Sequence, residues 1–132
     1  MALKYKVVSK KPRGMAGEKP PRYYPALTGR HAIDLDEVCD RISQRSTING
    51  ADVVGVVRSF IELIPELLLN GHNVKLDGFG TFSLHASGKG KDTPEEVSAK
   101  DITGLKMAFL PDKRIKRELG KAEFEKYRGN NS

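Results

Sequence analysis

Apolar residues in the middle of the chain recur with the spacing of α-helices. Leu35, Val38 and Ile42 share one face of a short predicted helix that ends near Arg45. The next predicted helix, over residues 50–69, is apolar on nearly every side. Its apolar positions include Val53, Val54, Val56, Val57, Phe60, Ile61, Leu63, Ile64, Leu67 and Leu68. Such a helix must be buried almost all round, and one short neighbour can hardly cover it, so the pattern predicts an intertwined dimer.

Capping residues mark the starts of both predicted helices. Asp34 precedes the first helix and Asn49 precedes the second. Each is followed three residues later by an acidic residue, Glu37 or Asp52, which is an acidic variant of the capping box. Asn70, with the glycine after it, predicts the end of the second helix.

Alternating apolar and polar residues after this helix predict β-strands. The expected order is strand, turn, strand, polar excursion, strand and short helix, over residues 74–76, 77–78, 82–84, 86–104, 105–109 and 113–119. The Asp-Gly pair in the turn favours a hairpin with one apolar face. Helices followed by an antiparallel sheet predict an α+β fold.

The two ends of the chain differ from its middle. Two strand-like pieces at residues 3–8 and 23–28 precede the helices, and Pro25 places the second of them at a sheet edge. The basic segment after residue 120 is expected to be partly disordered. The predicted regions are a basic N-terminal extension, a main domain and a basic C-terminal tail, over residues 1–33, 34–120 and 121–132.

Positive charge is concentrated at the ends of the 132 residues, whose formal net charge is +6. Residues 1–34 carry eight Lys and Arg against two Asp and Glu, and residues 86–132 carry 11 against eight. Residues 35–85 carry four against seven. Segregated positive charge favours a polyanionic partner.

The remaining composition excludes several classes of protein. A single cysteine, Cys39, rules out an intramolecular disulfide and fits a reducing, cytoplasmic compartment. No apolar run is long enough to predict a membrane span. His31, His72 and His85 are scattered without metal-ligand spacing. We find no active site and therefore expect no enzyme, metal, cofactor or small-molecule substrate.

Two sequence motifs, together with the order of the predicted helices and strands, resemble those of a known family. They are Gly-Phe-Gly-Thr-Phe at residues 78–82 and Phe-Leu-Pro-Asp-Lys at residues 109–113. Over about residues 34–120 the chain resembles the HU/IHF family of bacterial histone-like DNA-binding proteins. The basic extension resembles that of a longer variant branch. The resemblance implies an intertwined dimer with a helical base, a β-saddle and two β-arms that enter the DNA minor groove.

The resemblance assigns the polar excursion, residues 86–104, to the DNA-grasping arm. Its candidate phosphate contacts are Lys89, Lys91, Lys100 and, just beyond it, Lys106, and Pro94 is a candidate wedge between bases. The family's arm is rich in arginine, with an Arg-Asn-Pro-like tip. This arm has no arginine, and its three lysines face four acidic residues. We therefore expect its grip on DNA to differ from that of the family.

Other basic residues can compensate. In the last helix the family position that touches the phosphate backbone matches Lys113, Arg114, Lys116 and Arg117. In the N-terminal extension the candidates are Lys4, Lys6, Lys10, Lys11 and Arg13. The alternative is that the strands of the extension only widen a sheet. The expected dimer core is Val57, Phe60, Ile61, Ile64, Leu68, Phe79 and Phe82.

The sequence thus predicts a non-catalytic architectural protein of the nucleoid. It is expected to bind duplex DNA with weak sequence specificity, to bend or compact it, and to act as a homodimer, with a heterodimer with a related chain left open. The main alternative is an HU-fold dimer that serves as a protein-interaction module and has weak or lost DNA binding. RNA binding is a further alternative, for which few exposed stacking aromatics are available.

Overall fold

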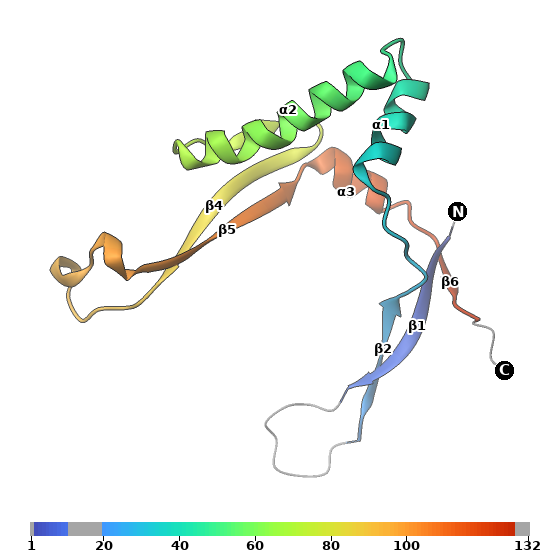
Figure 1. Cartoon of the computed structure of the whole chain (residues 1–132). Coiled ribbons are helices and arrows are strands. Elements are labelled where there is room, and N and C mark those ends of the chain that lie inside the picture. Colours follow the sequence, from blue (N-terminus) through green and yellow to red (C-terminus); the bar gives the residue numbers. More distant parts are fainter. Residues whose placement is uncertain (1, 11–19, 129–132) are drawn as a thin grey trace. The chain divides into compact units, whose positions relative to one another are not determined.

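The computed structural model describes residues 2–10 and 20–128, which divide into two compact units. The first unit comprises Met1–Ile33 with Leu119–Ser132, and the second comprises Asp34–Glu118. Helices and antiparallel strands both occur in the second unit, so the α+β prediction is confirmed (Figure 1).

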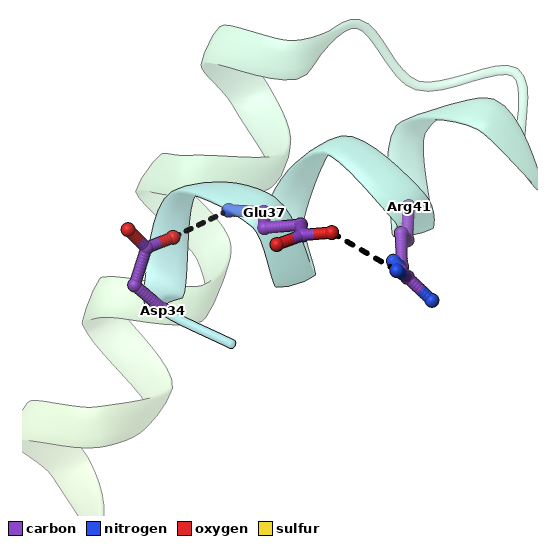
Figure 2. A network of polar contacts seen from close by, with 3 residues as sticks. All are labelled: Asp34, Glu37 and Arg41. Atoms are coloured by element: carbon purple, nitrogen blue, oxygen red, sulfur yellow. Dashed lines mark hydrogen bonds and ion pairs between the residues drawn. The ribbon is translucent and has the colours of Figure 1, made fainter. Parts of the chain in front are cut away.

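The first helix, α1 (Leu35–Gln44), begins at Asp34 as predicted. The Asp34 carboxylate accepts a hydrogen bond from the Glu37 backbone N–H at 3.0 Å (Figure 2). Because the first N–H groups of a helix have no partner within it, this bond satisfies one of them. Glu37 in turn accepts a hydrogen bond from the Arg41 guanidinium at 2.9 Å, one turn further along.

The second helix, α2 (Gly50–Leu69), has the same kind of start. The Asn49 side-chain oxygen accepts a hydrogen bond from the Asp52 N–H at 3.0 Å. The helix continues through Pro65 and ends at Asn70, and Gly71 then adopts a positive φ of 91°. This left-handed conformation is the usual way to stop a helix, and glycine adopts it without strain.

A three-stranded antiparallel sheet follows α2, with the order β3-β4-β5. Its strands are β3 (Val74–Leu76), β4 (Gly80–Gly88) and β5 (Ile102–Pro111). The third strand thus begins earlier than predicted, and β4 and β5 form a long ribbon that carries the polar excursion at its end (Figure 1). The short helix α3 (Lys113–Leu119) comes directly after β5, as predicted.

Cross-strand register gives this sheet one apolar face. Residues directly opposite each other in an antiparallel pair point to the same side, and Phe82 lies opposite both Val74 and Phe109. Further along, Leu84 lies opposite Met107. The rings of Phe79 and Phe82 are both in contact range of the Phe109 ring, with centroids 4.9 Å apart in each pair. The predicted hairpin with one apolar face is therefore confirmed.

The first unit contains a second sheet, in which the order is β2-β1-β6. Strands β1 (Leu3–Lys10) and β2 (Arg22–Leu27) are antiparallel, and Pro25 lies in an edge strand as predicted. The third strand, β6 (Phe124–Lys126), runs parallel to β1. The tail after residue 120 was expected to be partly disordered, and these three residues of it form a strand because their backbone pairs with the N-terminal strand.

Few apolar side chains are buried within one subunit. Among the described residues the buried apolar side chains are Cys39, Val53, Ile64 and Leu68. Of the predicted dimer core, Ile64 and Leu68 are thus already covered by their own chain, whereas Phe60, Ile61 and Phe79 stay exposed. Val57 and Phe82 are half-buried.

Gly80 offers a test of the packing between β4, β5 and the phenylalanine cluster. A Cβ atom at this position would lie 2.5 Å from the Leu110 carbonyl oxygen and 2.6 Å from the Phe109 ring. Overpacking of this kind costs about 2 kcal/mol. We therefore expect Gly80→Ala to lower the free energy of unfolding by about that amount in chemical denaturation. Gly90→Ala is the control, since its Cβ would meet nothing within 4 Å; equal stability of the two variants would contradict the packing described here.

Candidate nucleic-acid interface

We name the face of the β3-β4-β5 sheet opposite the apolar one its polar face, although Leu110 and Ala108 of β5 also lie on it, opposite Thr81 and Ser83. Alternation along β4 places Thr81, Ser83 and His85 on this face, and Lys106 of β5 lies directly opposite His85. Lys75 lies opposite Thr81 on the same side. His85 and Lys106 are exposed, and the hydroxyl side chains beside them are short. A face of short polar groups and cations can approach the backbone of a nucleic acid closely.

The carboxylate of Asp112 fixes the start of α3 to the β3–β4 turn. Its Oδ2 atom accepts a hydrogen bond from the Gly78 N–H at 2.7 Å, while the Asp112 N–H donates to the Phe79 carbonyl at 2.9 Å. In the first turn of α3 the Lys116 N–H donates to the Asp112 carbonyl. The helix is thereby attached at its first residues to the turn between two strands.

These hydrogen bonds determine the electrostatics of Asp112. The Gly78 N–H, and after it the Lys113 N–H, stabilise the ionised carboxylate and lower its pKa below the ordinary value of 3.8. The positive charge of Lys75 acts in the same direction. Asp112 is therefore ionised at neutral pH.

Four cations of α3 project from this attachment. All of them are exposed, whereas Ile115 between them is half-buried. Together with Glu118 they give the helix four positive charges against one negative charge. The Arg114 side chain lies against Gly78, since a Cβ atom there would be 3.2 Å from its guanidinium. The structure therefore places the four predicted phosphate-contacting residues of this helix close together. They are Lys113, Arg114, Lys116 and Arg117.

The arm is organised around Asp101. Two short 3₁₀ turns, Pro94–Glu96 and Ala99–Asp101, lie between β4 and β5. The Asp101 carboxylate accepts a hydrogen bond from the Ser98 N–H at 2.9 Å and lies 3.5 Å from the Lys91 ammonium. Its carbonyl accepts a hydrogen bond from the Lys89 N–H. Lys91 is therefore engaged within the arm.

The other arm candidates are exposed but lie close to negative charge. Lys89 and Lys100 are both exposed, and Pro94, the candidate wedge, is also exposed at the start of a 3₁₀ turn. Glu95 and Glu96 follow it directly in the same turn. The roles of these residues stay predictions.

The N-terminal candidates fall into three groups. Lys4 forms an ion pair with Glu125, with 2.9 Å between Nζ and Oε2. Lys6 and Lys10 are exposed on β1. Lys11 and Arg13 lie outside the described residues.

Two groups at this interface were not singled out from the sequence. Lys75 and His85 belong to the polar face of the sheet, and the same period-two alternation that predicted the strands would have placed them beside Lys106. The bond between Asp112 and Gly78 joins residues 34 apart in the sequence, so local sequence patterns did not reveal it.

Neither a metal site nor a membrane-spanning helix is found within the described ranges. Residues 2–10 and 20–128 contain no group of three or more His, Cys, Asp or Glu side chains arranged to hold a metal ion. None of the helices in that part of the chain has the length and apolar character needed to cross a membrane.

Comparison with known proteins gives consistent similarities. Over residues 1–126 the sequence matches the family described as an HU domain fused to wHTH, Ig, or glycine-rich motif. The integration host factor subunit alpha of Caulobacter vibrioides is 29% identical over 90 residues, which cover 64% of this chain and 90% of that protein. The same subunit from Actinobacillus succinogenes is 30% identical over 93 residues, covering 66% of this chain and 91% of that protein.

Two solved structures share the fold. A candidate bacterial DNA-binding protein from Bacteroides vulgatus aligns with 99% of this chain at a TM-score of 0.66 and 15% identity, and this chain spans about half of its length, 51%. The Anabaena HU–DNA cocrystal structure aligns with 67% of this chain and 99% of that chain, at a TM-score of 0.55 and 18% identity. The predicted HU-like α+β fold is therefore confirmed.

The lowered pKa of Asp112 generates a prediction on stability. A carboxylate whose pKa is lower in the folded state stabilises the fold at pH values above its unfolded pKa, and this contribution is lost as the pH falls through the folded value. We expect Asp112→Asn to lower the midpoint of thermal unfolding at neutral pH. The difference from the parent should shrink as the pH falls below 3.8.

The matched control is Asp92→Asn, which removes an exposed carboxylate of the arm. Circular dichroism melts of both variants across the acidic range would measure the effect. A constant difference between Asp112→Asn and the parent at every pH would show that the ionised carboxylate does not attach α3.

Proposed function

Because the chain belongs to the family of HU domains fused to a wHTH, Ig or glycine-rich motif, we propose that it is a non-catalytic, DNA-binding architectural protein. The observation that carries the proposal is the exposed cationic cluster of α3, attached through Asp112 to a sheet with one polar face. Cations on a fixed support can meet the phosphate backbone without first being ordered. In this role the protein acts in the nucleoid, where it bends or compacts DNA.

Binding is expected to have weak sequence specificity. Base reading in the major groove needs side chains such as Arg or Asn presented by a helix or ribbon that fits the groove. The cations of α3 instead lie on a short helix whose first residues are bonded to the β3–β4 turn. The polar face of the sheet carries hydroxyl groups, His85 and lysines. These groups suit contacts with phosphates and with the shape of the groove.

The arm contributes less than the family resemblance implies. Lys91 is paired with Asp101, and Glu95 and Glu96 lie beside the candidate wedge Pro94. Carboxylates close to phosphates oppose the attraction of the remaining lysines. The cationic cluster of α3 is therefore the main contact of this unit.

We also propose that the functional form is a dimer of two copies. On α2 the side chains of Val56, Ile61 and Leu63 are 66%, 51% and 46% exposed, and Leu105 and Met107 on the apolar sheet face are also exposed. A monomer in solution rarely leaves so much apolar surface uncovered. A second copy presents the same apolar helix and sheet face, which makes a self-complementary interface.

A second candidate function is a protein-interaction module with weak or lost DNA binding. The observation that favours it is the arm, whose residues 86–104 carry three lysines against four acidic residues. An arm with this balance can contact a basic protein surface more readily than a polyphosphate.

Duplex binding through α3 is tested by the salt dependence of affinity. Each phosphate contact adds about −0.9 to the slope of log affinity against log salt concentration. The triple variant Lys113→Gln, Lys116→Gln and Arg117→Gln should reduce the magnitude of this slope by about 2.7 for each copy of the chain that contacts the duplex. Arg114 is left unchanged because it packs against the β3–β4 turn. Fluorescence anisotropy with a labelled duplex in a KCl series gives the measurement.

The control removes the same charge from the arm, with Lys89→Gln, Lys91→Gln and Lys100→Gln. Its slope should change by less than half as much. If both variants kept the parent slope, the cluster would not be the contact surface. If the parent did not retard linear, nicked or four-way DNA in a gel at physiological salt, the interaction-module function would be preferred.

Dimer formation is tested by sedimentation equilibrium. The parent chain should sediment at twice its 14.6 kDa mass. Ile61→Glu should shift the protein toward the monomer or prevent folding, because it places a charge in the covered apolar surface. Arg58→Glu, a charge change on the same helix, is the control. A folded, monomeric parent protein would refute the dimer.

A further inference from the structure

The positive charge of the chain resides in its first unit. Met1–Ile33 with Leu119–Ser132 carries 11 Lys and Arg against three Asp and Glu, a formal charge of +8. Asp34–Glu118 carries 12 against 14, a formal charge of −2. The unit that contains α3 and the arm is therefore slightly acidic as a whole, and the surplus positive charge belongs to the small β2-β1-β6 sheet and the segments around it.

The register of that sheet sorts its side chains onto two faces. Lys6, Val8 and Lys10 alternate along β1 and point to one side. Opposite them on β2 lie Ala26, Tyr24 and Arg22, in that order. The ion pair between Lys4 and Glu125, which also lie opposite each other, agrees with this assignment of faces. We define the cationic face as Lys6, Lys10, Arg22 and Tyr24.

Two cations lie opposite each other at the end of the β1–β2 pair, and their repulsion destabilises the sheet. Lys10 and Arg22 lie directly opposite each other, and like charges in this position destabilise a sheet. Both are exposed, and within residues 2–10 and 20–128 neither forms a recorded ion pair. Lys6, also exposed, is four residues from Lys10, or about 13 Å along the strand. A bound polyanion would offset this repulsion.

Lys4 differs from these three residues. Its ammonium is already paired with Glu125 of β6, at 2.9 Å. The cation-rich part of the face is thus the part beyond β6, where β1 pairs with β2 alone. Tyr24, 43% exposed, lies opposite Val8 between these cations and offers a hydroxyl donor for a phosphate oxygen.

The opposite face has a different character. Tyr5, Pro25, Leu27 and Phe124 lie there, and together with Ala26, which the register places on the cationic side, they line a shallow, mainly apolar pocket of about 350 Å³. Of the four lysines in the described strands of this sheet, Lys4, Lys6 and Lys10 share one face, and Lys126 lies on the other. This concentration of cations on one face favours a polyanion as its partner.

We propose that the cationic face is a second binding site for the phosphate backbone of duplex DNA, separate from the α3 cluster. This rests on the proposed function, because the polyanion is taken to be the DNA held by the second unit. Lys6, Lys10 and Arg22 contact phosphates, and Tyr24 donates a hydrogen bond. Lys4 contributes little, since Glu125 neutralises it.

The test compares two double variants with equal loss of charge. Lys6→Gln with Lys10→Gln removes two cations of the proposed site, and should reduce the magnitude of the salt slope for duplex binding by about 1.8 for each copy of the chain that contacts the duplex. Lys126→Gln with Arg128→Gln is the matched control, because Lys126 lies opposite Tyr5 on the other face of the same sheet. Its slope should stay within a few tenths of the parent value.

A second readout does not depend on a substitution. In the full-length parent, acetylation of lysines by a reagent in excess can be followed by mass spectrometry with and without duplex. Lys6 and Lys10 should be protected by DNA, while Lys126 stays reactive. Thermal unfolding without DNA should show that Lys10→Gln is at least as stable as the parent at low salt, because it relieves the repulsion from Arg22.

The outcomes separate this proposal from the proposed function. If the parent fails to bind duplex, the proposed function fails. If the parent binds and the α3 variant is impaired, but Lys6→Gln with Lys10→Gln keeps the parent slope and both lysines are acetylated equally with and without DNA, this second site alone is refuted. Equal loss of slope in the test and control variants would also refute it, because the effect would then be one of net charge.

Discussion

The architecture of the main unit depends on one constraint, which is that α2 is apolar on nearly every side. A single subunit buries Val53, Ile64 and Leu68 of this helix, and leaves Ile61 and Leu63 about half exposed. A helix of this kind stabilises the fold only where something covers its remaining faces. With the proposed dimer as the cover, the stability of this unit should depend on protein concentration.

The charge of individual elements in this chain differs from the net charge of the unit that contains them. The main unit is slightly acidic overall, yet α3 carries four cations against one acid, and the Asp112 carboxylate is itself part of the attachment that presents them. Within the arm, Asp101 plays a comparable structural role by engaging Lys91 and the Ser98 N–H. Acidic residues near a surface meant for a polyanion are thus not only repulsive, since some of them organise the backbone that carries the lysines.

Local interactions explain which parts of the fold could be predicted from the sequence. The caps at Asp34 and Asn49 lie three residues from the N–H groups they bind, and strand alternation is visible within a few residues. By contrast, β6 is three residues long and pairs with a strand at the other end of the chain, so nothing nearby in the sequence reveals it. The Lys4–Glu125 and Lys91–Asp101 pairs depend on the same kind of distant register. The proposed DNA contacts follow from residue type and family resemblance.

The parallel pairing of β6 with β1 makes the small sheet discontinuous in sequence. Lys4 and Glu125 are 121 positions apart, so during synthesis the hairpin of β1 and β2 leaves the ribosome long before its third strand exists. Pairing of β6 with β1 closes a loop over the intervening residues, at an entropic cost that grows with the logarithm of the intervening length. Sequence separation of this size also slows folding. A change within Phe124–Lys126 would therefore act on the strand β1 with which this segment pairs.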